Sequence, residues 1–382
     1  MRKYENQRFN TSYDFGQGGI MSHRNVFIVL LLVLISCNLF SQNGALYFNA
    51  STPDNDYVSF GTNQYNQLFS GLSGYTFEGW INATSLASGT GRNRIINIQI
   101  NSGAVSLFMG LTQSGKIEIG ARSGNSDSYQ SAISANAVIT TGTWHHVAAV
   151  VNFATGSKSI RGYVDGVQVA SNTSPTFANT TFVPGPGALE NLGIHPSSLP
   201  TFADQFIGYM DEFRIWNYAR TASEVSEGMY IKLTGTETGI IGLWHFDETS
   251  GTTADDASAS NKNGTLINFP ADPWEDGVEN LSPVPTTQAS GLNATNIGVN
   301  SLTVNWDNGN GARRIVVMNT ENTFTNPVNG TDPSANSVWQ NSGQQVIYNG
   351  TGGSVPISGL DPGTKYWFRV YEYNGTGISL SI

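Results

Sequence analysis

The sequence predicts an all-β protein built from antiparallel strands. Residues 141–170 contain three apolar runs separated by short turns, and the second of these turns is Asp165-Gly166. An Asp-Gly pair between such runs is a strong hairpin signal, because both turn positions need positive φ. Only 12% of the 382 residues are charged while 43 are glycine, a composition typical of short strands joined by many turns.

The stretch 75–83, YTFEGWINA, is the best-patterned single strand. Its odd and even positions point to opposite faces, and each face carries aromatic residues. This pattern indicates a strand buried between two layers. Thr221 and Glu224 form a T-x-x-E capping box, which predicts that a helix begins at Thr221.

Several ordered motifs in the first two thirds of the chain carry a resemblance. They are ALYFN (45–49), TFEGWI (76–81), TWHHVA (143–148), YVDG (163–166) and GYMDEFRIWN (208–217). Their order and spacing resemble the laminin G-like, concanavalin A-type jelly-roll family. The resemblance implies two packed antiparallel sheets, and its relatives include lectins, sugar-binding modules and some glucanases. The fold alone does not choose among these functions.

The C-terminal part of the sequence shows a second pattern. Leu302, Val304 and Trp306 share one face of a strand, and L-x-P-G-T-x-Y runs from Leu360 to Tyr366. This pattern resembles a fibronectin type III domain, in the form found in secreted Bacteroidetes surface proteins. The resemblance implies an immunoglobulin-like sandwich in which the Tyr366 hydroxyl bonds back to nearby backbone. The sequence stops soon after the sixth expected strand, so we expect the last strand to be lacking.

The expected organisation therefore has four parts. An N-terminal extension with a signal peptide covers 1–42, and an antiparallel jelly-roll β-sandwich covers 43–268. A linker rich in proline and acidic residues covers 269–284, and the incomplete fibronectin type III sandwich covers 285–382.

The leader indicates export. Residues 26–35 form a ten-residue apolar run, too short for an ordinary membrane span and typical of a secretory signal, here Met21 to Gln42. The sequence leaves open whether the chain starts at Met1 or at Met21. We expect a secreted or cell-surface bacterial protein. Cys37, the only cysteine, allows a second interpretation: the residues before it resemble a lipoprotein signal, and lipidation would tether the protein to a membrane.

The net charge of −10 argues against a nucleic-acid partner, since no basic patch is present to neutralise phosphates. An acidic surface suits cations and neutral sugars. The expected partner is therefore a glycan or an extracellular protein surface, with a membrane only if Cys37 is lipidated.

A structural calcium site is one expectation of the jelly-roll resemblance. Relatives often place calcium near the end of the strand that corresponds to 206–216, close to the first strand. Asp211 and Asn49 match these two positions, with Asp56 a weaker candidate. Carboxylate, amide and backbone oxygens are suitable ligands for calcium. Calcium is therefore the only cofactor that we expect.

The chain is not expected to be an enzyme, and no catalytic residue is assigned. A retaining glucanase needs two carboxylates on one face of a strand, whereas Asp211 and Glu212 are adjacent and should face apart. The strand pattern E-x-D-x-x-E of catalytic relatives is absent from the sequence. His145 and His146 are also adjacent, so one imidazole should face the core and the other the solvent.

The predicted function is non-catalytic recognition of carbohydrate or protein through the jelly-roll domain. A structural adhesin or matrix component without a small ligand is the alternative, and a glycoside hydrolase is the weakest one. The ligand-binding residues are not identified by the sequence. Three tryptophans, Trp80, Trp144 and Trp244, lie in apolar strands and are expected in the core, whereas three loop aromatics are candidates for exposure: Tyr129, Phe177 and Phe182.

Overall fold

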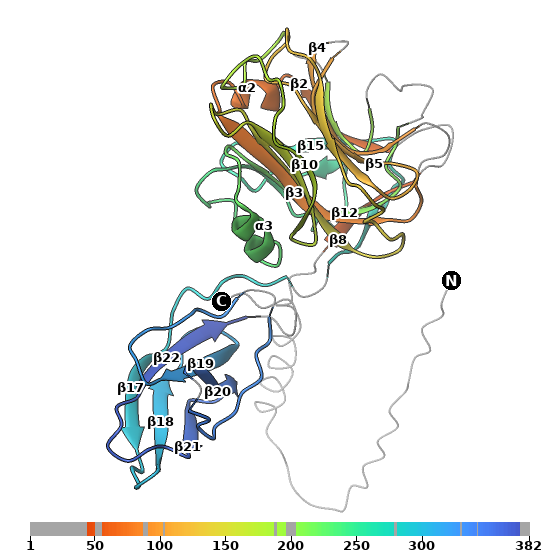
Figure 1. Ribbon diagram of the computed structural model, residues 1–382. Helices are drawn as coiled ribbons and strands as arrows, with labels where there is room; N and C mark the ends of the chain where they lie inside the picture. Colours follow the sequence, from red (N-terminus) through yellow and green to blue (C-terminus); the bar gives the residue numbers. More distant parts are fainter. Residues whose placement is uncertain are drawn as a thin grey trace, which may run out of the picture. The chain divides into compact units, whose positions relative to one another are not determined.

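The computed structural model describes residues 44–49, 56–86, 91–101, 104–186, 189–195, 204–278, 281–328, 331–341 and 343–374 (Figure 1). These residues belong to one compact unit, Asn43–Ile382. The predicted signal peptide and Cys37 lie outside the described residues. The fold is nearly all β, as predicted, with two short helices among the described residues: α2 (Tyr65–Leu68) and α3 (Ala222–Gly228). None of the helices in this part of the chain has the length and apolar composition to cross a membrane.

The first sandwich consists of two antiparallel sheets. Sheet A has the strand order β10-β9-β8-β3-β12-β1-β16, and β13 also pairs with β12. Its strands are β1 (Gly44–Phe48), β3 (Gly74–Ala83), β8 (His145–Asn152), β9 (Ser159–Val164), β10 (Val167–Asn172), β12 (Gly208–Trp216), β13 (Ile240–Trp244) and β16 (Trp274–Asp276).

Sheet B has the order β14-β15-β2-β11-β4-β5-β6-β7. Its strands are β2 (Tyr57–Thr62), β4 (Asn93–Asn101), β5 (Ala104–Leu111), β6 (Ile117–Ala121), β7 (Gln130–Ile133), β11 (Leu189–Leu192), β14 (Thr253–Ala254) and β15 (Gly264–Ile267). The predicted hairpin after β9 is confirmed, because Asp165 and Gly166 have φ values of 50° and 76°.

Aromatic side chains fill much of the space between the two sheets. Phe69 contacts Tyr75, Phe77 and Phe182 with ring centroids 5.0–5.9 Å apart. All four residues are at most 1% exposed. Burial of each large apolar side chain contributes about 2–3 kcal/mol to folding. Phe177 and Phe182, two of the candidates for exposure, instead pack into this core.

Strand β3 is buried on both faces, as its pattern predicts. Tyr75, Phe77 and Ile81 belong to the core between the sheets. On the outward face, Trp80 is 6% exposed and its indole N–H donates to the Met229 carbonyl at 3.0 Å. The part of the outward face of sheet A around Trp80 is therefore covered by the chain that follows α3. The predicted capping box at the start of α3 is confirmed by the reciprocal bonds of Thr221 and Glu224.

A β-bulge interrupts β12. Its pairing with β3 shifts register between Asp211 and Arg214, and Glu212 has φ 50°. Met210 and Phe213 both face the core, so the two residues between them lie on the outward side. The expectation that Asp211 and Glu212 face apart is thus wrong, because the bulge breaks the alternation.

Part of the segment expected as a linker belongs to the first sandwich. Trp274–Asp276 forms β16, which pairs with β1 at the edge of sheet A. Val278 and Leu281 are then buried against Trp80 and Met229. A proline-rich, acidic composition did not reveal this strand, because a three-residue edge strand has too few residues to show a period.

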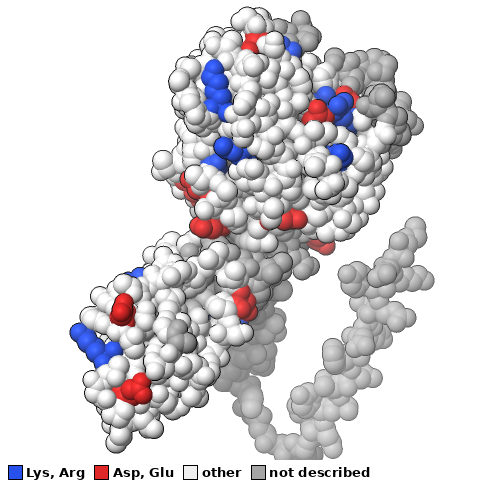
Figure 2. Space-filling view, viewed as in Figure 1, with Lys and Arg blue, Asp and Glu red and all other residues white. Residues whose placement is uncertain are grey.

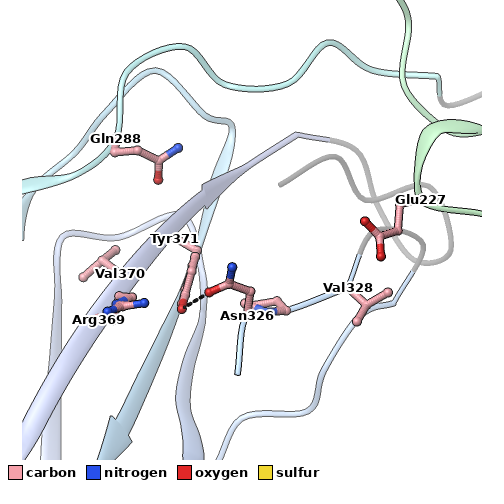
Figure 3. Close-up of a pocket in the computed structure, with 8 residues that line it drawn as sticks. Glu227, Gln288, Asn326, Val328, Arg369, Val370 and Tyr371 are labelled. Carbon is pink, nitrogen blue, oxygen red and sulfur yellow. Dashed lines mark hydrogen bonds between the residues drawn. The ribbon is translucent and has the colours of Figure 1, made fainter. Parts of the chain in front are cut away.

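The C-terminal strands form two three-stranded sheets. One is β17 (Ser290–Thr295), β18 (Ser301–Asp307) and β21 (Ser354–Ser358); the other is β20 (Gln345–Gly350), β19 (Arg313–Asn319) and β22 (Trp367–Tyr373). The face predicted for β18 is confirmed, since Val304 and Trp306 are buried with Leu302 packed beside them. On β22, the Tyr371 hydroxyl donates to Asn326 Oδ1 at 2.9 Å (Figure 3).

The backbone contact predicted for Tyr366 is present: its hydroxyl oxygen accepts the Asp361 N–H at 2.9 Å. The expected lack of a last strand concerns residues 375–382, which lie outside the described part of the chain.

We predict that Tyr366→Phe lowers the free energy of unfolding of the C-terminal sandwich by about 1 kcal/mol, because the Asp361 N–H loses its acceptor. Urea denaturation of the full chain, followed by tryptophan fluorescence, measures the change. Tyr57→Phe, which alters a half-buried tyrosine of β2 in the other sandwich, is the control. An unchanged transition in Tyr366→Phe would contradict the prediction.

Candidate functional site

A row of side chains crosses four neighbouring strands on the outward face of sheet A. Tyr47 of β1 lies opposite Tyr209 of β12, and Tyr209 lies opposite Asn82 of β3. Ile81 pairs with His145, which places Trp144 beside Asn82 at the start of β8. Four strands at about 4.8 Å spacing give the row a length of about 14 Å.

The three aromatic rings of this row lie close together. The ring centroids of Tyr47 and Tyr209 are 4.6 Å apart, with 32° between the ring planes. Trp144 follows, with its centroid 6.2 Å from that of Tyr209. All three side chains are half-buried, so part of each ring remains accessible. We call Tyr47, Tyr209, Asn82 and Trp144 the aromatic row.

A surface depression of about 270 Å³ lies at the row and is lined by Asn82, Trp144, Tyr209, Glu275 and Asp276. The two carboxylates are exposed and come from β16, the strand that pairs with β1. Asn82 Oδ1 is buried and has no hydrogen-bond partner in the structure. None of the described residues that line the depression is a lysine or an arginine.

This arrangement has a definite chemistry. Partly exposed aromatic rings provide apolar platforms, while the two exposed carboxylates provide hydrogen-bond acceptors. A ligand that matches it has an apolar face and several hydroxyl or amino donors along its edge. The site carries no positive charge to attract an anionic group.

The sequence interpretation missed this site. Trp80, Trp144 and Trp244 were all expected in the core between the sheets. Only Trp244 lies there, and Trp80 and Trp144 lie on the outward face of sheet A. The alternation of ALYFN does place Tyr47 opposite in direction to Leu46 and Phe48, which is the signal that was available. The pairing of Tyr47 with Tyr209 joins residues far apart in sequence and cannot be derived from a local pattern.

The structure does not bring the expected calcium ligands together. Leu46 pairs with Met210, so Asp211 lies beside Ala45, four residues or about 13 Å along β1 from Asn49. Asn49 instead meets the weaker candidate: its backbone N–H donates to Asp56 Oδ2 at 2.8 Å. Among the described residues, no group of three or more His, Cys, Asp or Glu side chains is placed to hold a metal ion.

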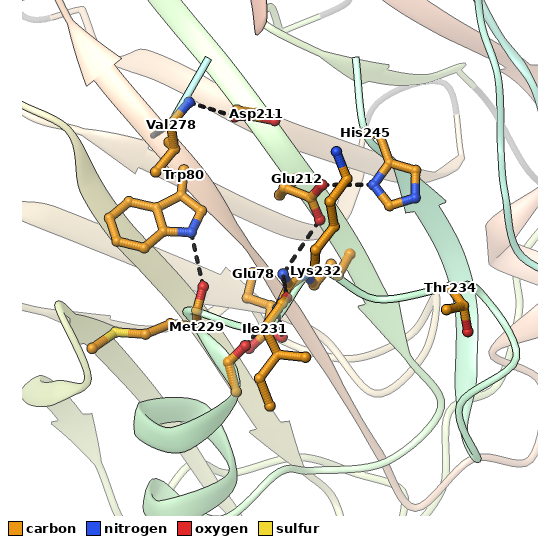
Figure 4. A network of polar contacts seen from close by, with 12 residues as sticks. Glu78, Trp80, Asp211, Glu212, Met229, Ile231, Lys232, Thr234, His245 and Val278 are labelled. Atoms are coloured by element: carbon orange, nitrogen blue, oxygen red, sulfur yellow. Dashed lines mark hydrogen bonds and ion pairs between the residues drawn. The ribbon is translucent and has the colours of Figure 1, made fainter. Parts of the chain in front are cut away.

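Asp211 has a structural partner. Its Oδ2 accepts the Val278 N–H at 2.7 Å, and the side chain is 1% exposed (Figure 4). Burial, and then the neighbouring Glu212 carboxylate, raise the pKa of Asp211. The bond from Val278 fixes the segment directly after Glu275 and Asp276, so Asp211 helps to position the acidic side of the depression.

Glu212 belongs to the same buried group. Its carboxylate contacts His245 Nδ1 at 2.6 Å and Arg214 Nη2 at 3.3 Å. Burial opposes its ionisation, but the His245 hydrogen bond and the Arg214 charge outweigh burial and lower the pKa of Glu212. Asp211 and Glu212 thus have pKa values shifted in opposite directions, a feature also seen in catalytic pairs. Because both are 1% exposed, they cannot touch a substrate in this conformation.

Glu78 is the centre of this charge network. Its Oε1 lies 2.6 Å from Arg220 Nη1, 2.9 Å from the Trp216 indole nitrogen and 3.7 Å from Arg214 Nη1. Burial alone would raise the pKa of Glu78, but the charges of Arg220 and Arg214 outweigh burial and lower it. Arg214 also donates to the Gly228 and Ile231 carbonyls at 2.9 and 2.5 Å. The network therefore fastens α3 and the chain after it to sheet A.

The positions of His145 and His146 differ from the expectation that one imidazole faces the core and the other the solvent. His145 Nδ1 contacts Asp165 Oδ2 at 2.8 Å near the surface. His146 is fully buried, but on the outward face beside Trp80, not in the core between the sheets. Neither of its ring nitrogens has a hydrogen-bond partner. Burial lowers the pKa of His146 from 6.5 to about 4.

Comparison with known proteins gives one family match. Residues 51–226 match the family model described as the concanavalin A-like lectin/glucanases superfamily. This stretch holds most of the strands that form the two sheets of the first sandwich. No curated protein matches the chain.

Similar folds occur among solved structures. A Bacteroides ovatus protein, provisionally described as carbohydrate binding, is 19% identical with a TM-score of 0.45; the match covers 62% of this chain and 61% of that one. The CBM40 domain of the Ruminococcus gnavus IT-sialidase, bound to α2,3-sialyllactose, is 12% identical with a TM-score of 0.38, covering 48% and 96%. A pentraxin from Limulus polyphemus is 15% identical with a TM-score of 0.38, covering 50% and 83%.

We predict that Glu78→Gln lowers the free energy of unfolding by about 3–5 kcal/mol, because it leaves two buried arginines without their shared carboxylate. Urea denaturation at neutral pH measures the loss. Glu321→Gln removes a charge from an exposed position and should change stability by less than about 0.5 kcal/mol. Equal stability of the two variants would contradict a role of the network in holding α3.

We predict a pH-dependent contribution of His146. The unfolded chain protonates this imidazole near pH 6.5, whereas the folded chain does so only near pH 4. The stability that the neutral imidazole contributes is therefore complete above pH 6.5 and is lost as the pH falls toward 4. The loss is about 1.4 kcal/mol per pH unit.

The measurement compares the free energies of unfolding of the unmodified chain and of His146→Gln at pH 7 and pH 5. The unmodified chain should lose about 2 kcal/mol more than the variant over this interval. Asp211 has the opposite effect on stability, because its raised pKa stabilises the folded state as the pH falls. Both proteins contain Asp211, so its contribution cancels when their losses of stability are subtracted. Parallel pH curves would contradict the prediction.

Proposed function

We propose that the chain is an exported, non-catalytic recognition protein whose jelly-roll domain binds a glycan at the aromatic row. The observation that carries this proposal is the row itself: three partly exposed rings lie beside a depression whose polar lining consists of Glu275, Asp276 and Asn82. Sugar rings present apolar C–H faces and peripheral hydroxyl groups, which match platforms and acceptors respectively. The family match of residues 51–226 agrees with this assignment.

The charge of the site narrows the ligand. Two exposed carboxylates lie in a chain of net charge −10, and no described lining residue is cationic. Uronic acids and sulfated sugars would be repelled there. The proposed ligand is therefore a neutral or amino-bearing oligosaccharide, and the length of the row suits several sugar rings rather than one.

A non-catalytic role is supported by the position of the perturbed carboxyl groups. Asp211 and Glu212, with oppositely shifted pKa values, are 1% exposed beneath the covering segment. Acid–base catalysis requires carboxyl groups that flank the bond to be cleaved.

The leader sequence supports export of the chain, so the proposed glycan binding would take place outside the cell or on its surface.

We also infer that residues 285–374 form a fibronectin type III-like spacer. Support comes from the two antiparallel sheets β17-β18-β21 and β20-β19-β22 and from the bond between Tyr366 and the Asp361 backbone. In such sandwiches a tyrosine hydroxyl bonds back to backbone a few residues upstream.

The test of glycan binding uses a glycan array with the full chain, followed by calorimetry on the best neutral ligand. Trp144→Ala and Tyr209→Ala should each weaken binding about tenfold, because each removes a stacking platform. Trp367→Ala, a half-buried aromatic of the C-terminal sandwich, should leave the affinity unchanged.

The alternatives give different results. No binding across many neutral and amino-bearing glycans would contradict the proposal and favour a structural adhesin. Release of reducing sugar from a bound glycan would contradict the non-catalytic role and favour a glycoside hydrolase.

A further inference from the structure

A stack of cations and aromatic rings lies on the outward face of sheet B. The Arg94 guanidinium lies 3.8 Å from the centroid of the Phe108 ring. Phe108 is stacked with Tyr129, with 5.7 Å between centroids and 2° between planes. The Arg122 guanidinium lies 6.0 Å from the Tyr129 centroid, at the far end of the stack. Contacts of this kind are favourable because the ring face is electron-rich.

The strands are arranged to accommodate this stack. Leu107 and Met109 face the core, so Phe108 between them faces outward. Phe108 pairs with Gly120 of β6. A Cβ atom at Gly120 would lie 2.0 Å from the Tyr129 hydroxyl oxygen and 2.4 Å from the Phe108 ring. Only glycine therefore lets the Tyr129 ring lie flat across β6, where 38% of the residue is exposed.

Arg94 is poorly satisfied in its surroundings. The residue is 9% exposed, and its buried Nε and Nη1 atoms have no hydrogen-bond partner. Its ion pair with Asp204 is long, 3.6 Å from Nε to Oδ2. Beside it, Asn97 and Asn191 pair across β4 and β11, and both amide groups are fully buried without any hydrogen-bond partner. Buried polar groups are rarely left unpaired, and each costs about 1–3 kcal/mol.

The charges around the stack are mostly paired, but several arginine N–H donors are not. Arg92 pairs with Glu118, and Arg94 faces Asp204. Arg122 donates to the Asp127 carbonyl at 2.6 Å, and its Nε atom has no partner. Three arginines thus lie close to three acidic residues, Glu118, Asp204 and Asp127, and the unpaired donors belong to Arg94 and Arg122. Charged side chains are sparse on the face of the molecule that Figure 2 shows, and the chain as a whole has net charge −10.

We propose that this face is a second ligand site, one that takes a carboxylate- or sulfate-bearing saccharide. The anionic group would bind Arg94, whose planar fork matches two oxygens at once, with Arg92 supplying further attraction. The exposed Tyr129 ring would serve as the platform for the sugar. The depression beside the aromatic row of sheet A is lined by two carboxylates and by no arginine or lysine, so an anionic group is favoured only at the sheet B face.

The experiment titrates the full chain with a hyaluronan tetrasaccharide, which carries carboxylates, and with its carboxyl-reduced, neutral form. Calorimetry should detect binding of the anionic form only, and added salt should weaken it. Arg94→Gln should weaken binding at least about tenfold. Arg94→Lys should recover only part of this loss, because an ammonium group keeps the charge but not the fork.

Arg94 is buried, so a second variant tests the site without disturbing the fold. Arg92 has a side chain 38% exposed, and Arg92→Gln should weaken binding several-fold while the melting temperature stays within the range of surface substitutions. Arg161→Gln, on β9 of sheet A, is the matched control and should bind normally. Trp144→Ala should also bind the anionic ligand normally, which separates this site from the aromatic row.

Three outcomes would overturn the proposal: equal binding of the neutral form, unchanged affinity in both Arg94→Gln and Arg92→Gln, or equal binding of a poly-glutamate peptide. The last result would assign the face to acidic polypeptides instead of saccharides.

Discussion

The first sandwich depends on a group of buried charges that fastens a covering segment to the outward face of sheet A. Glu78 neutralises Arg220 and approaches Arg214, and Arg214 holds the Gly228 and Ile231 carbonyls. Such a network is expensive to desolvate and is stable only because each charge has its partner in place. Its consequence is geometric: the outward face of a sheet that would otherwise meet water becomes a second, partly polar core.

The bulge in β12 places two further carboxylates on the outward face of sheet A, beside this charge network. One extra residue between Met210 and Phe213 turns both Asp211 and Glu212 outward, where regular alternation would send one of them into the apolar core. Asp211 then holds the Val278 N–H, directly after β16. The same distortion that removes a carboxylate from the core thus positions β16, whose Glu275 and Asp276 line the depression beside the aromatic row.

The sequence predicted those structural features that depend on residues close together in the chain. The two-faced β3, the Asp165-Gly166 hairpin and the capping box at Thr221 all depend on residues near one another in sequence, and all are confirmed. The aromatic row could not be derived in this way, since it depends on the register of four strands taken from different parts of the chain. The bulge reversed the inference for Asp211 and Glu212, because one inserted residue changes the face of every residue after it.

The two outward faces of the sandwich present opposite chemistry to a ligand. The depression beside Trp144 is lined by Asn82 and by Glu275 and Asp276, whose exposed carboxylates accept hydrogen bonds. On sheet B, the stack includes Arg94, whose buried Nε and Nη1 donors have no hydrogen-bond partner. Because the two sheets face away from each other, the two proposed sites do not merge into one binding surface, and each would take its own ligand or its own stretch of a long glycan.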